Sequence, residues 1–326
     1  MARLSRSLSR IFAVVAAVAL TTGLQPAQAA YPERTITIVC ASGAGGAVDV
    51  TTRIITDHMS KTLGQNIVVQ NEPGAGGTLA INTVAKAAPD GYTLLTIGPT
   101  VSTLAELFPN TKVDVIRDLQ PVSVIGATPM VLMMHKDVPG ADYASFLAYT
   151  KSHSGELTFA SNGRGSAGHL AGSLFKKMAG VDLRYIPYRT TPQATADLIG
   201  GRISMIWLSS LGNLAGTGAV RPVAVTLTGE RWNQFPDVPT FDELGLKGYE
   251  ATTWVSMYGP KSAPKEIAER LTAALNAALA DPAVQKRLDQ VGIVKPRTTG
   301  PAFLEKYLKD EIEKWNDILR TTKDTD

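Results

Sequence analysis

The segment Gly163–Gly168 holds the residues that come nearest to catalytic or cofactor-binding machinery. It reads Gly-Arg-Gly-Ser-Ala-Gly and fits G-x-G-x-x-G between a predicted strand and a predicted helix, which is the context of a dinucleotide-binding loop. Such a loop also needs an acidic residue after the next strand to bind the ribose. Tyr188 and Arg189 stand there instead. We therefore predict no dinucleotide and no other cofactor.

Ser166, in the same segment, could instead be a nucleophile. A G-x-S-x-G elbow needs glycine two residues before the serine, where this chain has Arg164. His169 lies only three residues after Ser166, too close to serve easily as a separately oriented base. No H-E-x-x-H, C-x-x-C, Walker A or calcium-loop pattern occurs, so no metal is predicted. A secreted α/β hydrolase using Ser166 remains the alternative to a protein that catalyses nothing.

Loops rich in glycine, serine and threonine follow several predicted strands. The first, Ala41–Ala47, precedes a helix that begins near Val48. Backbone N–H groups and hydroxyls beside the positive end of a helix suit a carboxylate that is bound without reaction. Arg164 and Arg189 lie in two further loops and could add charge-assisted hydrogen bonds. The alternative for the first loop is a connection that needs glycine only for its dihedral angles.

Two series of strand–loop–helix units must position these loops. Successive units of this kind form a parallel sheet with right-handed crossovers, and their loops meet outside the same strand ends. The sequence therefore predicts an α/β fold with two lobes, each a mainly parallel sheet flanked by helices, with a ligand cleft between the lobes. The predicted strands are Thr35–Cys40, Ile67–Gln70 and Tyr92–Ile97 in the first series, and Leu157–Ala160, Leu183–Tyr188 and Ile203–Leu208 in the second.

Each lobe is predicted to use particular stretches of the chain. Lobe 1 comprises residues 30–135 and 251–326, and lobe 2 comprises residues 136–250, because the chain leaves one sheet and later returns to it. The two crossings are expected to form a hinge. The tail is predicted to be helical over Lys265–Ala280, Ala283–Val291 and Pro301–Leu319, packing on a sheet or strapping the lobes together.

Residues 1–29 have the order of a secretory signal peptide. A basic segment with three arginines precedes the apolar run Ile11–Leu20, and Ala27-Gln28-Ala29 fits a cleavage site. We predict cleavage near Ala29 or Ala30 and an exported protein.

Removing this leader changes the charge balance. The chain has 32 basic and 29 acidic residues, and the leader holds three arginines and no acid, which leaves 29 of each. No basic surface for nucleic acid is therefore expected. The single cysteine, Cys40, is predicted to be a buried apolar residue.

A series of short motifs carries a family resemblance over most of the chain. The motifs are Tyr31-Pro32, Gly45-Gly46 with Asp49, Asn71–Gly77, Ala87–Leu95, Ala160–Gly163 with Ser166, His169–Gly172, Pro187-Tyr188, Asp237–Thr240, Gly248–Ala251 and Asp281–Val284. In this order and spacing, the sequence resembles the Bug-type, TctC-like extracytoplasmic solute receptors of tripartite tricarboxylate transporters.

The resemblance implies a type II periplasmic-binding-protein fold that closes on a small organic acid. It implies a periplasmic location, delivery of the ligand to the membrane components of a tripartite tricarboxylate transporter, and a monomer. A ligand sensor for a membrane kinase is a further alternative. The expected ligand-binding residues are Ser42, Gly43, Ala44, Gly45, Gly46, Asp49, Pro99, Thr100, Val101, Ser161, Asn162, Arg164, Gly165, Ser166, His169, Tyr188, Arg189 and Ser209.

Three departures from the family pattern bear on the ligand. Cys40–Ala44 replaces a common Pro-Phe-Pro-Pro run, Arg164 replaces a common asparagine, and Leu208–Ser210 stands where an aspartate often follows the strand. Losing an acid and gaining an arginine favours a more anionic or larger ligand. Citrate-like tricarboxylates, C4–C6 dicarboxylates, aromatic carboxylates and nicotinate-like acids all remain open.

Overall fold

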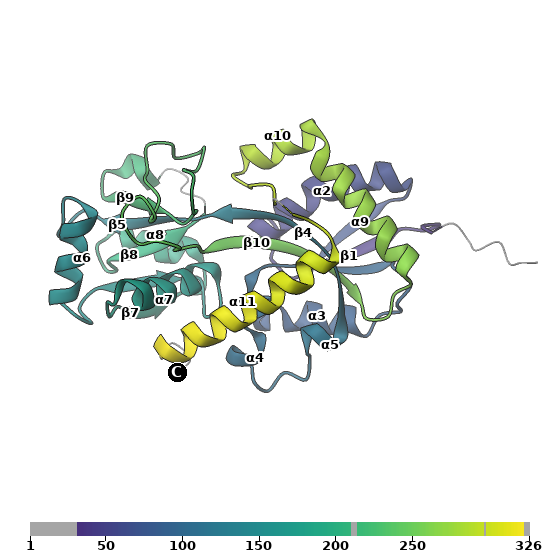
Figure 1. Ribbon diagram of the computed structural model, residues 1–326, viewed down its shortest axis with the longest axis horizontal. Helices are drawn as coiled ribbons and strands as arrows, with labels where there is room; N and C mark the ends of the chain where they lie inside the picture. Colours follow the sequence, from purple (N-terminus) through teal and green to yellow (C-terminus); the bar gives the residue numbers. More distant parts are fainter. Residues whose placement is uncertain (1–30, 210–213, 297, 323–326) are drawn as a thin grey trace, which may run out of the picture. The chain divides into compact units, whose positions relative to one another are not determined.

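The computed structural model describes residues 31–209, 214–296 and 298–322. Both of its sheets lie in the unit that begins at Arg34 (Figure 1). The first sheet has the order β2-β1-β3-β10-β4. Its strands are β1 (Ile36–Cys40), β2 (Ile67–Asn71), β3 (Thr93–Ile97), β4 (Leu119–Pro129) and β10 (Thr252–Pro260).

The second sheet has the order β7-β6-β8-β5-β9. Its strands are β5 (Val131–His135), β6 (Thr158–Ser161), β7 (Arg184–Pro187), β8 (Met205–Leu208) and β9 (Val220–Val225). The predicted two-lobed α/β fold is confirmed. Both sheets are mixed: β2, β1 and β3 are parallel, as are β7, β6 and β8, whereas β10 and β5 run antiparallel to their neighbours.

The chain passes between the sheets at two places. It leaves the first sheet at Pro129, enters the second at Val131, and returns between β9 and β10. The predicted boundary after His135 differs from this arrangement, because all of β5 pairs with strands of the second sheet. Val131–Met134 is buried throughout, and a continuous apolar run does not indicate which sheet it joins. The lobe boundaries stay a prediction, and β5 favours a crossing at Met130.

Helices surround both sheets and end where the local sequence requires it. Gly64 and Gly180 take left-handed dihedrals after α2 and α7 and so end these helices. Helices α2, α9 and α10 contact one another (Figure 1). Within the described residues, the α-helices are α2 (Ala47–Leu63), α3 (Thr78–Ala85), α4 (Leu104–Leu107), α5 (Val115–Asp118), α6 (Tyr143–Ser152), α7 (Ala167–Ala179), α8 (Thr191–Ile199), α9 (Lys265–Ala280), α10 (Pro282–Gln290) and α11 (Pro301–Thr322). The short 3₁₀ helices are η1 (Ala75–Gly77), η2 (Pro99–Ser102) and η3 (Leu214–Thr217). Within the described residues, no helix has the length and apolar character needed to cross a membrane.

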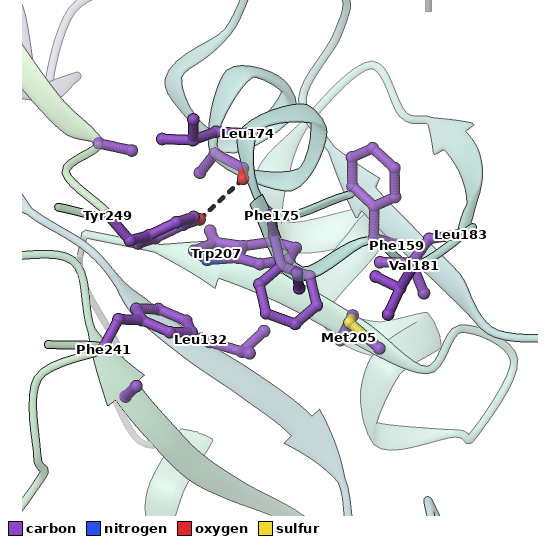
Figure 2. Packing of buried hydrophobic residues seen from close by; sticks show 14 of the residues in the cluster. Leu132, Phe159, Leu174, Phe175, Val181, Leu183, Met205, Trp207, Phe241 and Tyr249 are labelled. Carbon is purple, nitrogen blue, oxygen red and sulfur yellow. Dashed lines mark hydrogen bonds between the residues drawn. The ribbon is translucent and has the colours of Figure 1, made fainter. Parts of the chain in front are cut away.

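The core around the second sheet is built on Trp207 of β8 (Figure 2). Phe175 of α7 lies with its ring centroid 5.7 Å from that of Trp207, and Phe159 of β6 meets Trp207 edge-on at 6.0 Å. Tyr249 is fully buried and donates its hydroxyl to the Ala171 carbonyl of α7 at 2.7 Å. Because Tyr249 precedes β10, this hydrogen bond fixes the returning chain to α7.

We expect Tyr249→Phe to lower the free energy of unfolding by about 1 kcal/mol, because it removes the hydrogen bond to Ala171 and leaves the ring in place. Urea denaturation of the full chain measures this change. A denaturation midpoint equal to that of the wild type would contradict it.

Helix α11 contributes to the cores of both sheets. Leu304 and Leu308, in its first half, pack with Trp254 and other residues of the first sheet. Trp315 and Ile318, in its second half, pack with the core of the second sheet. An α-helix of 22 residues is about 33 Å long, which is enough to reach both cores. Of the two roles expected for the tail helices, packing on a sheet or strapping the lobes together, the packing of α11 favours the second.

Polar contacts add to this packing. Arg320 donates to both carboxylate oxygens of Glu106 in α4, its shortest contact being 2.8 Å. Lys177 of α7 pairs with Asp317 of α11. One partner of each pair, Asp317 or Arg320, is largely exposed, so each pair adds only modestly to stability.

Candidate functional site

The first glycine loop, Ser42–Gly46, joins β1 to α2. Gly43, Ala44 and Gly45 are exposed, and the Gly46 N–H donates to the Gly43 carbonyl at 3.1 Å. Gly45 has a φ of +78°, which favours glycine, and a Cβ at Gly46 would lie 2.5 Å from Ser42 Oγ. Gly45 is thus needed for the backbone path, and the loop is open to solvent at Gly43–Gly45.

The buried carboxylate of Asp49 holds this loop through hydrogen bonds. Asp49, in the first turn of α2, is 2% exposed. Its Oδ2 accepts the Gly45 N–H at 2.9 Å, and its Oδ1 accepts Asn71 Nδ2 at 2.8 Å and Arg53 Nε at 3.0 Å. Burial alone would raise the pKa of Asp49, but the hydrogen bonds from Arg53, Gly45 and Asn71 outweigh it and lower that pKa below its ordinary value. Asp49 is therefore ionised and fully engaged within the loop.

The second loop, between β6 and α7, is held by three hydroxyl groups. Ser161 is buried, and its Oγ lies 2.8 Å from the Tyr185 hydroxyl and 2.9 Å from the Gly163 carbonyl oxygen. Ser166 Oγ lies 3.0 Å from Ser161 Oγ and donates to the Gly163 carbonyl at 2.7 Å. Ser166 also caps α7 by accepting the His169 N–H at 3.4 Å. These hydroxyls fasten the loop.

His169 takes part in the same loop. Its side chain is buried, and Nδ1 accepts the Gly165 N–H at 3.1 Å. The Tyr185 ring packs against the His169 ring, with centroids 4.4 Å apart. The Nδ1 atom of His169 accepts from the loop backbone at Gly165, and the Ser166 hydroxyl donates to the Gly163 carbonyl. His169 therefore shapes the loop and does not activate Ser166.

The segment that follows β3 lies beside the second loop and beside the start of α2. A Cβ at Gly165 would lie 3.2 Å from Thr103 Oγ1 and 3.8 Å from Thr100 Cγ2. At the other end of the segment, a Cβ at Gly98 would lie 3.3 Å from Val48 Cγ2, beside the first loop. Among the residues predicted here, Pro99 and Val101 are buried. This segment thus reaches from the second loop to the start of α2, which follows the first loop.

Other predicted residues lie at the margins of this arrangement. The Tyr188 N–H donates to the Ser161 carbonyl at 2.9 Å, but its hydroxyl donates to Asp197 at 2.7 Å. Burial, helped by that hydrogen bond, raises the pKa of Tyr188 to about 12. Ser209 is half-buried at the end of a described stretch. The exposed residues are Asn162, Arg164 and Arg189. Whether these residues contact the ligand is a prediction that the binding experiments described below test.

Three residues of this arrangement were missed by sequence reasoning: Arg53, Asn71 and Tyr185. Asn71 stands opposite Cys40 in the parallel pairing of β1 with β2, which places its amide beside the first loop. Tyr185 stands opposite Phe159 in the pairing of β6 with β7. A polar residue at the end of a neighbouring strand is the one signal that could have found Asn71.

We expect Tyr185→Phe to weaken ligand binding a few-fold while changing thermal stability little. The half-buried ring keeps its packing, and the Ser161 hydroxyl loses a neighbour that orients it. Titration calorimetry against a bound carboxylate, with the melting temperature of the ligand-free protein as control, measures both effects. Unchanged affinity would show that the Ser161 orientation does not matter.

The combined site offers N–H groups, hydroxyls and few titratable side chains. No group of three histidine, cysteine or acidic residues that could hold a metal occurs in the described part of the chain. A hollow of about 490 Å³ lies beside α4; it shares Leu107 with the surroundings of Gly165 and includes none of the predicted ligand residues. The chemistry available to the two loops is recognition of a small anion by hydrogen bonds.

Comparison with known proteins agrees with this geometry. The family described as tripartite tricarboxylate transporter family receptor matches residues 51–323. BugT of Bordetella pertussis is 32% identical over 327 residues, covering 97% of this chain and 98% of BugT.

Two solved structures with carboxylates extend the comparison. MatC of Rhodopseudomonas palustris with bound malate is 33% identical, with a TM-score of 0.75 over 89% of this chain and 100% of MatC. Rpa4515 of R. palustris with adipate is 31% identical, with a TM-score of 0.78 over 90% of this chain and 98% of Rpa4515. The family resemblance expected from the sequence is confirmed: the chain belongs to the TctC, Bug-type family of tripartite tricarboxylate transporter receptors and is a solute-binding protein, not an enzyme.

Proposed function

We propose that this protein is a periplasmic receptor that captures a small dicarboxylate of about the size of malate or adipate between two closing lobes. It then delivers the ligand to the membrane components of a tripartite tricarboxylate transporter. The observation that carries the proposal is the pair of loops, Ser42–Gly46 and Ser161–Ser166, whose backbone and hydroxyl groups are prearranged without a nucleophile–base pair. Residues 1–29, which lie outside the described residues, are the proposed signal peptide, cleaved near Ala29 or Ala30.

The chemistry of the loops supports a carboxylate in particular. A carboxylate only accepts hydrogen bonds, and the loops carry backbone N–H groups and the Ser161 and Ser166 hydroxyls. These two hydroxyls donate to the Gly163 carbonyl in the structure and would turn to the ligand when it binds. Related proteins of the family have been solved with malate and with adipate. Arg164 lies in the second loop and adds a positive charge that suits a second carboxylate. We therefore favour C4–C6 dicarboxylates over nicotinate-like and other monocarboxylic acids.

Closure is proposed to occur about the two crossings between the sheets. Thr226 is buried between them: its N–H donates to the Met130 carbonyl at 2.9 Å, and its carbonyl accepts the Ala251 N–H at 3.4 Å. The Met130 N–H donates to Thr226 Oγ1 at 2.9 Å. Both crossings thus share one anchoring residue, which suits rotation about a common axis.

A thermal-shift screen of mono-, di- and tricarboxylates tests the proposed function. We expect a C4–C6 dicarboxylate to raise the melting temperature, because a ligand that binds only the folded state stabilises it by mass action. An ester-hydrolysis assay runs beside it, and hydrolysis that disappears with Ser166→Ala would contradict a binding-only role. Capture of a membrane kinase by the liganded protein would instead favour the sensor alternative.

A further inference from the structure

The first glycine loop depends on three side chains that the binding proposal does not use as ligand contacts. Asp49 accepts from Gly45, and Asn71 Nδ2 donates to the Ser42 carbonyl at 2.9 Å. Arg53 joins the other two, because its NH2 group lies 2.9 Å from Asp49 Oδ1 and donates to Asn71 Oδ1 at 3.0 Å. These three side chains are called the loop clamp below.

The orientation of the Asn71 amide is fixed by its surroundings. Its nitrogen faces two oxygens, Ser42 O and Asp49 Oδ1, whereas its oxygen faces the Arg53 guanidinium. A flipped amide would place oxygen against both acceptors and nitrogen against a donor, so only one orientation satisfies the network. Asn71 therefore acts as a donor to both the loop backbone and the buried carboxylate.

The clamp also neutralises the negative charge of Asp49 beside the first loop. Asp49 is ionised beside a loop that is proposed to receive a carboxylate, and two negative charges at short range repel each other. The Arg53 guanidinium neutralises Asp49 through contacts to both of its oxygens, at 3.0 and 3.1 Å from Nε. With every Asp49 contact directed within the clamp and the loop, the Asp49 side chain serves the loop and not the ligand.

We infer that Asp49, Arg53 and Asn71 are positioning residues that set the first loop for the ligand carboxylate through the backbone of Ser42 and Gly45. This inference rests on the proposed function and deepens it. It reassigns Asp49 from a ligand contact to a loop holder, and it adds Arg53 and Asn71 to the residues that determine affinity.

Asn71→Asp is the sharpest test, because it keeps the size of the side chain and turns its donor into an acceptor. At about pH 8 we expect roughly tenfold weaker binding of adipate or malate, since a charge-assisted hydrogen bond to the clamp is replaced by repulsion. The matched control is Asn66→Asp, which adds the same charge at an exposed position before the same strand.

Acid should partly rescue the Asn71→Asp variant. Two adjacent carboxylates share a proton readily, so one of them should protonate near pH 5 and again donate a hydrogen bond. The ionisable groups around position 71 are Asp49 and Arg53 of α2, the buried Cys40 opposite it in β1, and the neighbouring Glu72. The affinity of the variant divided by that of the wild type should therefore increase as the pH falls from about 8 to about 5. A mere packing defect would leave this ratio unchanged.

A second variant keeps the inference testable if Asn71→Asp fails to fold. Arg53 is 48% exposed, so Arg53→Gln should fold, and it leaves Asp49 without its counter-ion. Arg287→Gln is the control, because Arg287 of α10 is 47% exposed and pairs at 2.9 Å with Asp57 of α2, the helix that also carries Arg53. We expect about tenfold weaker binding for Arg53→Gln and no change for Arg287→Gln.

The outcomes separate this inference from the proposed function. If the wild type binds no carboxylate, the proposed function is wrong. If the wild type binds and both clamp variants bind within twofold of it at about pH 8, the clamp inference alone is wrong. A loss of affinity for Asn71→Asp that is equal at about pH 8 and about pH 5 would also overturn the positioning role.

Discussion

Replacing Glu311 by alanine is expected to lower the free energy of unfolding by about 2–6 kcal/mol, because two buried indole N–H groups would each lose their acceptor. Glu311 lies midway along α11 and is 7% exposed. Its Oε2 accepts Trp315 Nε1 at 2.7 Å and Trp254 Nε1 at 3.2 Å. Lys314 is the cation beside it, with Nζ 3.3 Å from Oε1.

The two tryptophans explain why this effect should exceed that of an ordinary surface pair. Trp254 belongs to the core of the first sheet and Trp315 to that of the second. One carboxylate therefore accepts an indole N–H from each core. Its loss should loosen α11 at the point where the helix passes between the two cores. Urea denaturation of Glu311→Ala measures the effect, with Glu311→Gln expected to lose less because its amide oxygen still accepts.

The exposed Glu313→Ala on the same helix is the control for this prediction. It removes the same charge two residues away without uncovering a buried donor. We expect the control to change the free energy of unfolding by less than about 0.5 kcal/mol. Equal losses for Glu311→Ala and Glu313→Ala would show that the shared carboxylate does not stabilise the two cores.

Arg164→Ala is expected to weaken binding of a dicarboxylate by roughly tenfold to a hundredfold. Arg164 stands between Gly163, with a φ of +121°, and Gly165, with a φ of +75°, in the loop before α7. A guanidinium at this point can present a planar pair of donors to a carboxylate in a closed site. Charge-assisted hydrogen bonds of this kind are worth roughly 1.5–3 kcal/mol, which sets the expected range.

Two comparisons sharpen the Arg164 prediction. Arg164→Asn should lose most of the affinity as well, while the melting temperature of the ligand-free protein stays the same. Arg184→Ala removes an exposed arginine from β7, outside the predicted site, and should bind normally. Titration calorimetry of the wild type and all three variants decides the matter. Affinities within about twofold of the wild type for both Arg164 variants would place the charge recognition elsewhere.

Much of the fold could be predicted because its signals are local. The β-branched run before the first glycine loop indicates a strand, and β1 does run from Ile36 to Cys40. Cys40 is buried, as predicted. Helices α10 and α11 begin at Pro282 and Pro301, since proline suits the first turn of a helix. These features depend on neighbours within a few residues.

The features that could not be predicted depend on which strands become neighbours. The membership of β5 in the second sheet is set by its pairing with β8 and β9, which an evenly apolar run does not encode. The clamp exists because β2 pairs with β1 in a register that brings Asn71 opposite Cys40. Ligand contact by Tyr188 stays a prediction, and the hydrogen bond from its hydroxyl to Asp197, near the C-terminal end of α8, has no local sequence signal. Such contacts follow from tertiary arrangement rather than local pattern.

Native mass spectrometry of the protein purified from the periplasm tests the central claim most directly. We predict a one-to-one complex whose added mass matches a small organic dicarboxylate, removed by partial unfolding and restored by adding the same acid. A protein that carries no organic acid, and that binds none of the C4–C6 dicarboxylates when they are added to it, would contradict the assignment of this receptor to small dicarboxylates.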